Sequence, residues 1–388
     1  MNKKDVANIR KQFKPDNEMM KIQEIFNVYV QKESGDIYHH ISQLFEMMEH
    51  EYQELFLANF KKVLTGQLDS KLFELKFRRE SVENSTQAVL FEILNAETTA
   101  DRNDYMLQIV DKMFENKKYD FDTVVTFIFG EYRKPVRKRD ADSEEGGNDH
   151  VYSNKFVLCS LNRTDQPKRN LVFDYIEKQF RSNNDVDPII NLTKPLTGFL
   201  FPTFTDNAAD VNHILYSSGK ANEPDVGFIE EVLECEEILT AAEDKDCFEL
   251  IVSNVIGDKV DSTIVSNIYE EIDRIVQEHK DDEEEQEEPS LDYRDVEKIL
   301  TVSGVENVET ERVKDAFNII VDDEKHEFKA SSLLPKTIKI KTEVASLSLN
   351  PKDLKNVKYI NYNGKRCLLV EIEDDVVIEG FQLETAKI

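Results

Sequence analysis

The sequence contains no tryptophan, few cysteines and no long apolar run. Its four cysteines lie far apart and include no CxxC pair and no metal-ligand spacing, so we expect reduced thiols at Cys159, Cys235, Cys247 and Cys367. A membrane-spanning helix needs roughly 18 apolar residues in a row, and no run approaches this length. The start of the chain also lacks the apolar segment of a signal peptide. These absences predict a cytoplasmic protein that does not enter a membrane.

Motifs that mark the common enzyme classes are also missing. The chain has no HExxH, GxSxG, GxxxxGKS/T or GxGxxG, which belong to zinc proteases, serine hydrolases, P-loop proteins and dinucleotide-binding proteins. His39, His40 and His50 lie near glutamates, but Met47 stands where a di-iron Glu-x-x-His pair would need its carboxylate. We therefore predict no cofactor and no metal site, and we favour a protein without enzymatic activity.

Positive charge is scarce relative to negative charge. The chain of 388 residues carries 49 Lys and Arg against 78 Asp and Glu, a net charge of −29. Such a balance disfavours unspecific attachment to nucleic acid or to an anionic membrane. Residues 281–288 hold seven carboxylates and precede Pro289, which is typical of a solvated linker. We predict an N-terminal domain over residues 1–280, an acidic linker over 281–289 and a C-terminal domain over 290–388.

Strand and helix patterns are mixed in the predicted N-terminal domain. Strands are expected where β-branched and aromatic residues dominate, at 25–30, 122–132, 152–161 and 198–202. Apolar residues at helical spacing predict helices at 48–63, 86–94 and 105–114. Residues 133–150 form a polar loop between two strands, and residues 171–180 form an amphipathic piece. This order predicts an α+β fold, with an antiparallel or mixed sheet flanked by helices.

The predicted C-terminal domain is smaller and combines helices with a β-sheet. Apolar spacing indicates helices at 296–300 and 309–316, and a β-rich pattern follows, beginning with residues 317–321. Asn363 and Gly364 separate two β-rich runs. This dipeptide is the strongest short hairpin signal, because both residues tolerate the positive φ of a type I′ turn.

A basic segment is the first candidate for a binding site. Five cations follow Tyr132 within seven residues, at Arg133, Lys134, Arg137, Lys138 and Arg139. Such a segment can bind the phosphates of a nucleic acid or an acidic protein partner. The alternative is a self-neutralising loop, in which these cations pair with the acidic residues of 140–149 or with the acidic linker.

Two sparse patterns resemble catalytic sets. Asp225, Glu243 and Lys245 match the carboxylate-and-lysine pattern of metal-dependent nucleases, in which carboxylates hold a divalent cation and lysine orients water. The same residues stand at expected helix starts, where carboxylates act as caps, and we favour that interpretation. Cys159 and His213 could form a nucleophile and its base, but a buried structural cysteine is far commoner.

The N-terminal part of the chain resembles an uncharacterised bacterial family, domain-of-unknown-function family 4317. The resemblance covers most of the first 260 residues and is carried by residues 2–5, 9–13, 156–160 and 198–204, with Asp206, His213, Leu215 and Tyr216. Its most specific part is the Gly-Phe-Leu-Phe-Pro block at 198–202. The family implies no catalytic residues.

A second and weaker resemblance is to bacterial nucleoid-associated proteins. It rests on the order of elements and on residues 338–341, 347–351 and 357–372. This resemblance implies nucleic-acid binding, although fold-level analogy alone is a thin warrant for function.

Together these patterns favour a non-enzymatic cytosolic interaction or binding protein. We expect an unidentified protein partner, and the sequence is compatible with a homo-oligomer. The first alternative is a nucleoid-associated protein that binds nucleic acid through residues 133–139. The second is a metal-dependent nuclease that uses Asp225, Glu243 and Lys245.

Overall fold

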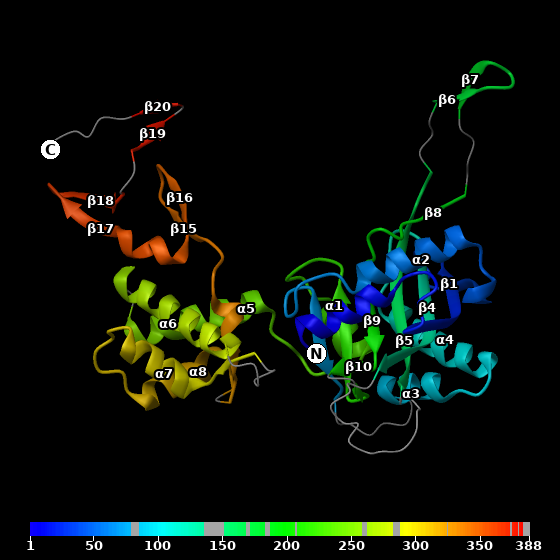
Figure 1. The fold of residues 1–388 in the computed structure, drawn as a ribbon, viewed down its shortest axis with the longest axis horizontal. Coiled ribbons are helices and arrows are strands. Elements are labelled where there is room, and N and C mark those ends of the chain that lie inside the picture. Colours follow the sequence, from blue (N-terminus) through cyan, green and yellow to red (C-terminus); the bar gives the residue numbers. More distant parts are fainter. Residues whose placement is uncertain are drawn as a thin grey trace. The chain divides into compact units, whose positions relative to one another are not determined.

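The computed structural model separates the chain into two compact units, each with its own hydrophobic core (Figure 1). Unit 1 spans Met1–Thr240 and unit 2 spans Ala241–Ile388. The structure describes residues 1–78, 85–135, 151–167, 171–182, 187–205, 208–257, 262–281, 288–323, 325–372, 375–378 and 380–382.

The division between the units falls before the acidic run and not within it. Helices α5 (Ala241–Ile256) and α6 (Ser262–Asp281) belong to unit 2, whereas the sequence placed them before a boundary at residues 281–289. The reason is packing, because Ile251 of α5 and Ile272 of α6 share one core with Val296 and Phe317. Residues 282–287 of the predicted linker lie outside the described residues.

Unit 1 is built on one antiparallel sheet in the order β2-β1-β4-β5-β9-β12-β3, with β8 paired to β5 beside this path. Every strand pairing in it is antiparallel, which confirms the predicted α+β class. The strands are β1 (Met20–Val30), β2 (Ile37–Leu44), β3 (Leu72–Lys76), β4 (Thr123–Pro135), β5 (Val151–Asp165), β8 (Ile189–Ile190), β9 (Thr197–Phe201) and β12 (His213–Ser218).

Helices cover both faces of this sheet. Helices α1 (Lys3–Gln12) and α2 (His50–Val63) pack on one face, and α3 (Thr86–Asn95) and α4 (Thr99–Glu115) pack on the other. Side chains of β5 alternate between the two cores, with Phe156 and Leu158 in the first and Val157 and Cys159 in the second. All five residues of β9 are buried, as expected for a strand covered on both sides.

A buried ion pair joins α4 to the sheet. Nη1 of Arg102 donates to Oε2 of Glu24 on β1 at 2.8 Å, and both side chains are almost fully buried. The guanidinium also lies 3.9 Å from the ring centroid of Phe129 on β4 and donates to the Ala96 carbonyl at 3.2 Å. Removing one partner of such a pair typically costs about 3–5 kcal/mol. This contact therefore fixes where α4 lies on β1 and β4.

Residues 171–180, predicted only as an amphipathic piece, lie in a hairpin. The hairpin consists of β6 (Leu171–Asp174) and β7 (Gln179–Ser182), with Phe173 opposite Phe180. Apolar residues here recur at a spacing that serves a strand as well as a helix, so periodicity could not separate the two. A second small hairpin joins β10 (Thr203–Thr205) to β11 (Ala208–Asp210). The described part of unit 1 also contains the 3₁₀ helix Phe45–Met47 and the π-helix Phe228–Val232.

Unit 2 is a helical core followed by short hairpins. The helices α7 (Tyr293–Val302), α8 (Thr310–Ile320) and α9 (Ala330–Leu333) join α5 and α6 around one core. The predicted strand at 317–321 is wrong, since residues 317–320 belong to α8 and Phe317 is fully buried. Its ring lies 5.4 Å from that of Phe328, so helical packing against the core decided the local structure.

The hairpins of unit 2 confirm the Asn-Gly signal. Asn363 and Gly364 have φ values of 51° and 76° and join β17 (Val357–Tyr362) to β18 (Lys365–Val370). The remaining strand pairs are β13 (Ser290–Leu291) with β14 (Phe328–Lys329), β15 (Ile338–Lys341) with β16 (Ser346–Leu349), and β19 (Val377–Ile378) with β20 (Phe381–Gln382). A 3₁₀ helix at Pro351–Asn356 precedes β17.

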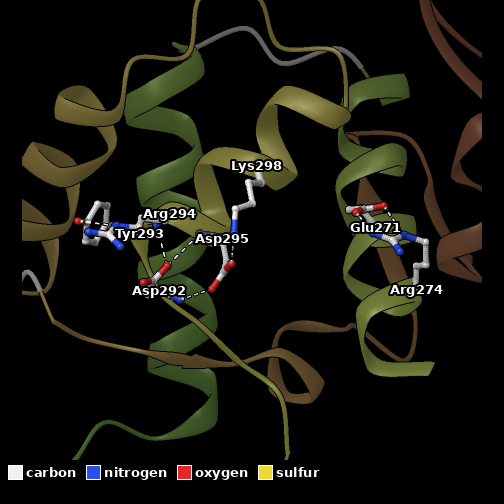
Figure 2. Close-up of polar contacts among 7 residues, drawn as sticks. All are labelled: Glu271, Arg274, Asp292, Tyr293, Arg294, Asp295 and Lys298. Atoms are coloured by element: carbon white, nitrogen blue, oxygen red, sulfur yellow. Dashed lines mark hydrogen bonds and ion pairs between the residues drawn. The ribbon is translucent and has the colours of Figure 1, made fainter. Parts of the chain in front are cut away.

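Charged side chains fix the start of α7 (Figure 2). The Asp292 carboxylate accepts hydrogen bonds from the backbone N–H groups of Arg294 and Asp295, at 2.8 and 3.0 Å. Asp295 in turn accepts from the backbone N–H of Asp292 at 3.3 Å, which completes a capping box. Elsewhere in Figure 2, Arg274 on α6 donates through Nε to Glu271 at 2.9 Å.

Replacing Gly198 with Ala should destabilise unit 1. An added Cβ would lie 2.4 Å from the Cys159 carbonyl oxygen and 2.8 Å from Cγ1 of Val63, closer than packed atoms approach. Overpacking of this kind typically costs about 1–3 kcal/mol. Denaturant unfolding should show that loss for Gly198→Ala, whereas Gly227→Ala, whose Cβ meets nothing nearer than 3.7 Å, should stay within about 0.5 kcal/mol of wild type. Equal stability of the two variants would contradict the packing around β9.

Candidate functional site

A pocket of about 570 Å³ lies at one end of the central strands of unit 1. Because neighbouring strands are antiparallel, the end of β5, the start of β9 and the end of β12 meet at the same edge of the sheet. β5 supplies Arg163 and Asp165, β9 supplies Thr197, and β12 supplies Tyr216. The wall also includes residues from the chain that follows α4, the chain that precedes β9 and the chain that follows β12.

The pocket is lined by charged side chains of both signs, with cations in excess. Its cations are Lys117, Arg163, Lys194 and Lys220, and its carboxylates are Asp165, Glu223 and Asp225. Each carboxylate pairs with one cation: Arg163 with Asp165 at 2.9 Å, Lys220 with Glu223 at 3.0 Å, and Lys117 with Asp225. Lys194 forms no ion pair with any described residue. One positive charge in the wall is therefore unpaired within the described part of the chain.

The Lys117–Asp225 pair lies beside the buried Tyr216 and the half-buried Tyr119. The Tyr216 hydroxyl accepts a hydrogen bond from the backbone N–H of Asp225 at 3.1 Å, and burial raises the pKa of Tyr216. Burial also raises the pKa of Tyr119, whose ring centroid lies 5.5 Å from Nζ of Lys117. Burial alone would lower the pKa of Lys117, but the hydrogen bonds and charges of Asp225 and Tyr119 raise it. Lys117 therefore stays protonated in the pocket.

Arg163 is held from two sides. Its guanidinium carbon lies 4.7 Å from the ring centroid of Phe121, and its Nε faces Asp165. Asp165 is itself fixed, because Nδ2 of Asn191 donates to Oδ2 at 3.0 Å. The Nη groups of Arg163 have no hydrogen-bond partner among the described residues. A planar guanidinium fixed in this way can present its remaining donors to a carboxylate or a phosphate.

The three residues of the nuclease-like pattern, Asp225, Glu243 and Lys245, do not belong to the same unit. Asp225 belongs to unit 1, whereas Glu243 and Lys245 belong to α5 of unit 2. Oδ1 of Asp225 accepts a hydrogen bond from the backbone N–H of Phe228 at 3.3 Å, the kind of contact that a carboxylate makes with the first turn of a helix. Lys245 pairs with Glu249 along α5 at 3.8 Å.

The basic segment is described only at its start. Arg133 lies in the last part of β4 and pairs with Glu131 at 3.2 Å, and Lys134 follows it in the strand. Arg137, Lys138 and Arg139 lie outside the described residues. Binding of nucleic acid or of an acidic partner by this segment therefore stays a prediction.

Cys159 and His213 do not form a nucleophile and base. Cys159 is buried in the middle of β5, where burial raises its pKa well above the ordinary value. In the sheet register Cys159 is level with Phe199 and Tyr216, so His213 lies two strands away and three positions along β12. Nδ1 of His213 contacts Oδ2 of Asp210 at 2.6 Å.

Histidines near glutamates do not gather into a ligand set. His39 and His40 lie on β2, and His50 begins α2, where its Nδ1 lies 3.7 Å from Oε1 of Glu54. Within the described ranges, no group of three or more His, Cys, Asp or Glu side chains could hold a metal ion.

Sequence reasoning did not find the pocket cations. These cations, Lys117, Arg163, Lys194 and Lys220, are far apart in the sequence and belong to no motif. The sequence offered one indication of these pocket residues, which is their position: Arg163 and Lys220 lie where buried strands end. Charged residues at strand ends are common, so this signal becomes specific only once the sheet order is known.

Asp225→Asn and Asp225→Ala should separate the two roles of Asp225. Both changes remove the half-buried ion pair with Lys117, for which about 1 kcal/mol is expected. Asn still accepts the hydrogen bond from Phe228, whereas Ala loses this cap, at a typical cost of about 1 kcal/mol. Denaturant unfolding of unit 1 should therefore rank Asp225→Ala below Asp225→Asn. The reverse order would contradict the capping role.

Comparisons with known proteins place the chain in a family. Residues 1–381 match the family described as Domain of unknown function (DUF4317), so the similarity extends well past the first 260 residues and into both units. No curated protein and no solved structure matches the chain, and the resemblance to nucleoid-associated proteins gains no support. Among the described helices, none has the length and apolar character needed to cross a membrane. The chain belongs to the DUF4317 family.

Proposed function

We propose that the chain is a non-enzymatic binding protein whose unit 1 holds a small organic anion in the pocket at the sheet end. The ligand carries a carboxylate or a phosphate. The observation that carries this proposal is the excess of cations in the pocket wall, four against three carboxylates. The whole chain has the opposite balance, with 78 acidic against 49 basic side chains. A local excess of cations in an acidic protein favours a negative ligand at this site.

The internal ion pairs support binding because they hold the cations in place before a ligand arrives. Asp165 orients Arg163 through Nε, and Asp225 orients Lys117, so less side-chain freedom is lost on binding. Lys194 supplies charge that no described carboxylate neutralises. An entering anion would meet Arg163 and Lys194 directly and would satisfy donors that otherwise face solvent.

The size and lining of the pocket fit a small metabolite. Its volume of about 570 Å³ falls within the roughly 300–1,000 Å³ of small-molecule sites. Tyr119, Leu196 and Tyr216 add apolar surface beside the charged groups. Such a mixture suits an organic anion better than a bare inorganic ion, because apolar contacts and charge-assisted hydrogen bonds both contribute.

A panel of anions tests the proposal through thermal unfolding. The panel contains inorganic phosphate, citrate, succinate, adenosine monophosphate and glucose 6-phosphate, with glucose and adenosine as uncharged comparisons. A ligand at 100 times its Kd stabilises the folded state by about 2.7 kcal/mol. For a unit of this size the melting temperature of unit 1 should then rise by about 5–10 °C. At least one organic anion should produce this shift, and calorimetric titration should give one site per chain.

Matched double variants locate the effect. Arg163→Gln with Lys194→Gln removes two pocket cations, and the shift should disappear. Arg78→Gln with Lys76→Gln removes the same two charges from unit 1 outside the pocket, where these side chains pair with Glu230 and Glu236. That control should retain the shift. No shift with any anion, or equal loss in both double variants, would overturn the proposal.

A further inference from the structure

The hairpins of unit 2 reverse the charge balance of the chain. Residues 336–366 carry eight cations and two carboxylates, whereas the whole chain has 78 acidic against 49 basic side chains. All eight cations are exposed. They are Lys336, Lys339, Lys341, Lys352, Lys355, Lys358, Lys365 and Arg366. We call residues 336–366 the basic hairpin region, because they include the hairpins β15–β16 and β17–β18.

Most cations of the basic hairpin region have no carboxylate partner. Lys352 pairs with Asp273 of α6 at 3.6 Å, and Lys358 pairs with Glu371 at 3.9 Å. The other six form no ion pair with any residue that the structure describes. Because carboxylates are abundant in this protein, six unpaired cations in one short stretch favour an external anion as their partner.

The first hairpin, β15–β16, separates polar from apolar side chains. In its register Lys339 is opposite Ser348, and Lys341 is opposite Ser346. Directly opposed side chains share one face of a strand pair, so these four form one exposed face. The isoleucines and leucines of the two strands are half-buried on the other face. Ammonium and hydroxyl groups both donate hydrogen bonds, which suits the oxygens of a phosphate.

The second hairpin, β17–β18, adds aromatic rings. Tyr359 and Tyr362 of β17 are exposed, at 68% and 43%. They lie on opposite faces, because successive side chains of a strand alternate. Lys365 is directly opposite Tyr362, and Arg366 lies diagonally across from Tyr359 on the same face. Each face of this hairpin therefore carries a ring together with a cation.

The base of β17–β18 is fixed to the helical core of unit 2. Leu354 and Val357 are buried, and Oγ of Ser262 on α6 donates a hydrogen bond to the Val357 carbonyl at 3.0 Å. The hairpin extends from this base beyond the helices (Figure 1). Its rings and cations are thus held on a regular element and face solvent.

We propose that the basic hairpin region binds single-stranded nucleic acid. The cations contact the phosphates, and unpaired bases stack on Tyr359 and Tyr362. Proteins that bind single strands without sequence preference combine these two elements. A duplex keeps its bases stacked on one another, so the exposed rings favour a single strand. This site belongs to unit 2 and is independent of the anion pocket of unit 1.

The net charge of −29 limits where nucleic acid can bind and does not prevent this contact. Exposed charges that lie more than about 10 Å apart are largely screened at 0.1 M salt. The local balance of eight cations against two carboxylates therefore governs binding at the basic hairpin region. The acidic remainder of the chain disfavours unspecific attachment elsewhere.

Fluorescence anisotropy of the full chain tests the proposal. The probes are labelled oligothymidylate and oligouridylate of about 12 nucleotides, which carry the same phosphate and base chemistry and distinguish DNA from RNA. We expect a Kd of about 1–100 μM near physiological salt. If four to six phosphates are neutralised, the Kd should rise roughly 50- to 300-fold between 50 and 200 mM salt.

Matched charge variants locate the phosphate contacts. Lys365→Gln with Arg366→Gln removes two cations and should reduce the slope of log Kd against log salt by about 1.4. Lys298→Gln with Lys325→Gln removes the same charge from exposed positions of unit 2 outside the basic hairpin region. This control should leave the slope and the Kd unchanged.

Tyrosine variants test stacking separately from charge. Tyr359→Ala with Tyr362→Ala should weaken binding by at least about fivefold, because stacking on one ring is typically worth about 5- to 150-fold in affinity. The salt slope should stay as in wild type. Tyr359→Phe with Tyr362→Phe keeps the rings and should bind like wild type. Circular dichroism should show that all these variants fold.

Several results would overturn the proposal. They are no binding of either oligonucleotide at roughly 50 mM salt, tighter binding of a duplex of the same length, and equal behaviour of the two charge variants. Binding to vesicles that contain phosphatidylserine, without binding to oligonucleotides, would also overturn it and would assign the basic hairpin region to an anionic lipid surface.

Discussion

The structure of unit 1 depends on the burial of its central strands on both faces. All five residues of β9 are buried, and β5 sends alternate side chains into two separate cores. A strand of this kind needs helices on both sides, which α1 and α2 supply on one face and α3 and α4 on the other. Such a strand also leaves no room for a larger side chain where its neighbours lie closest, as at Gly198 of β9, between Cys159 and Val63. The order of the elements follows from this constraint.

The same constraint determines where a polar site can form. Charged groups are costly in the two-sided interior, and a deeply buried ion pair among the described residues, Glu24 with Arg102, attaches α4 to the sheet. Charges can gather at the strand ends, where the covering helices stop. Antiparallel order then brings Arg163 and Lys194 to one edge although they are distant in sequence. The pocket is a consequence of the sheet and needs no local motif.

Local sequence patterns predicted individual strands and hairpins better than they predicted how these elements pack together. β4 and β5 were predictable from runs of β-branched and aromatic residues, and Asn363 with Gly364 specified the β17–β18 hairpin by backbone chemistry alone. The predicted boundary at 281–289 differs from the division between Thr240 and Ala241, because an acidic run indicates solvated chain, whereas the division depends on which residues α5 and α6 bury. Asp225 was selected for a nuclease pattern and lies in the pocket as a cap and a partner of Lys117. Long-range contacts decide such roles, and one sequence does not contain them.

Hydrogen–deuterium exchange of the full chain, with and without the best-binding organic anion, tests the central claim most directly. Binding in the pocket should slow exchange in peptides that cover 115–121, 161–165, 191–197 and 216–225. Peptides of unit 2 should keep their rates, because none of its described residues lines the pocket. Protection confined to other segments, or no protection at saturating anion, would contradict the assignment of this pocket as the binding site.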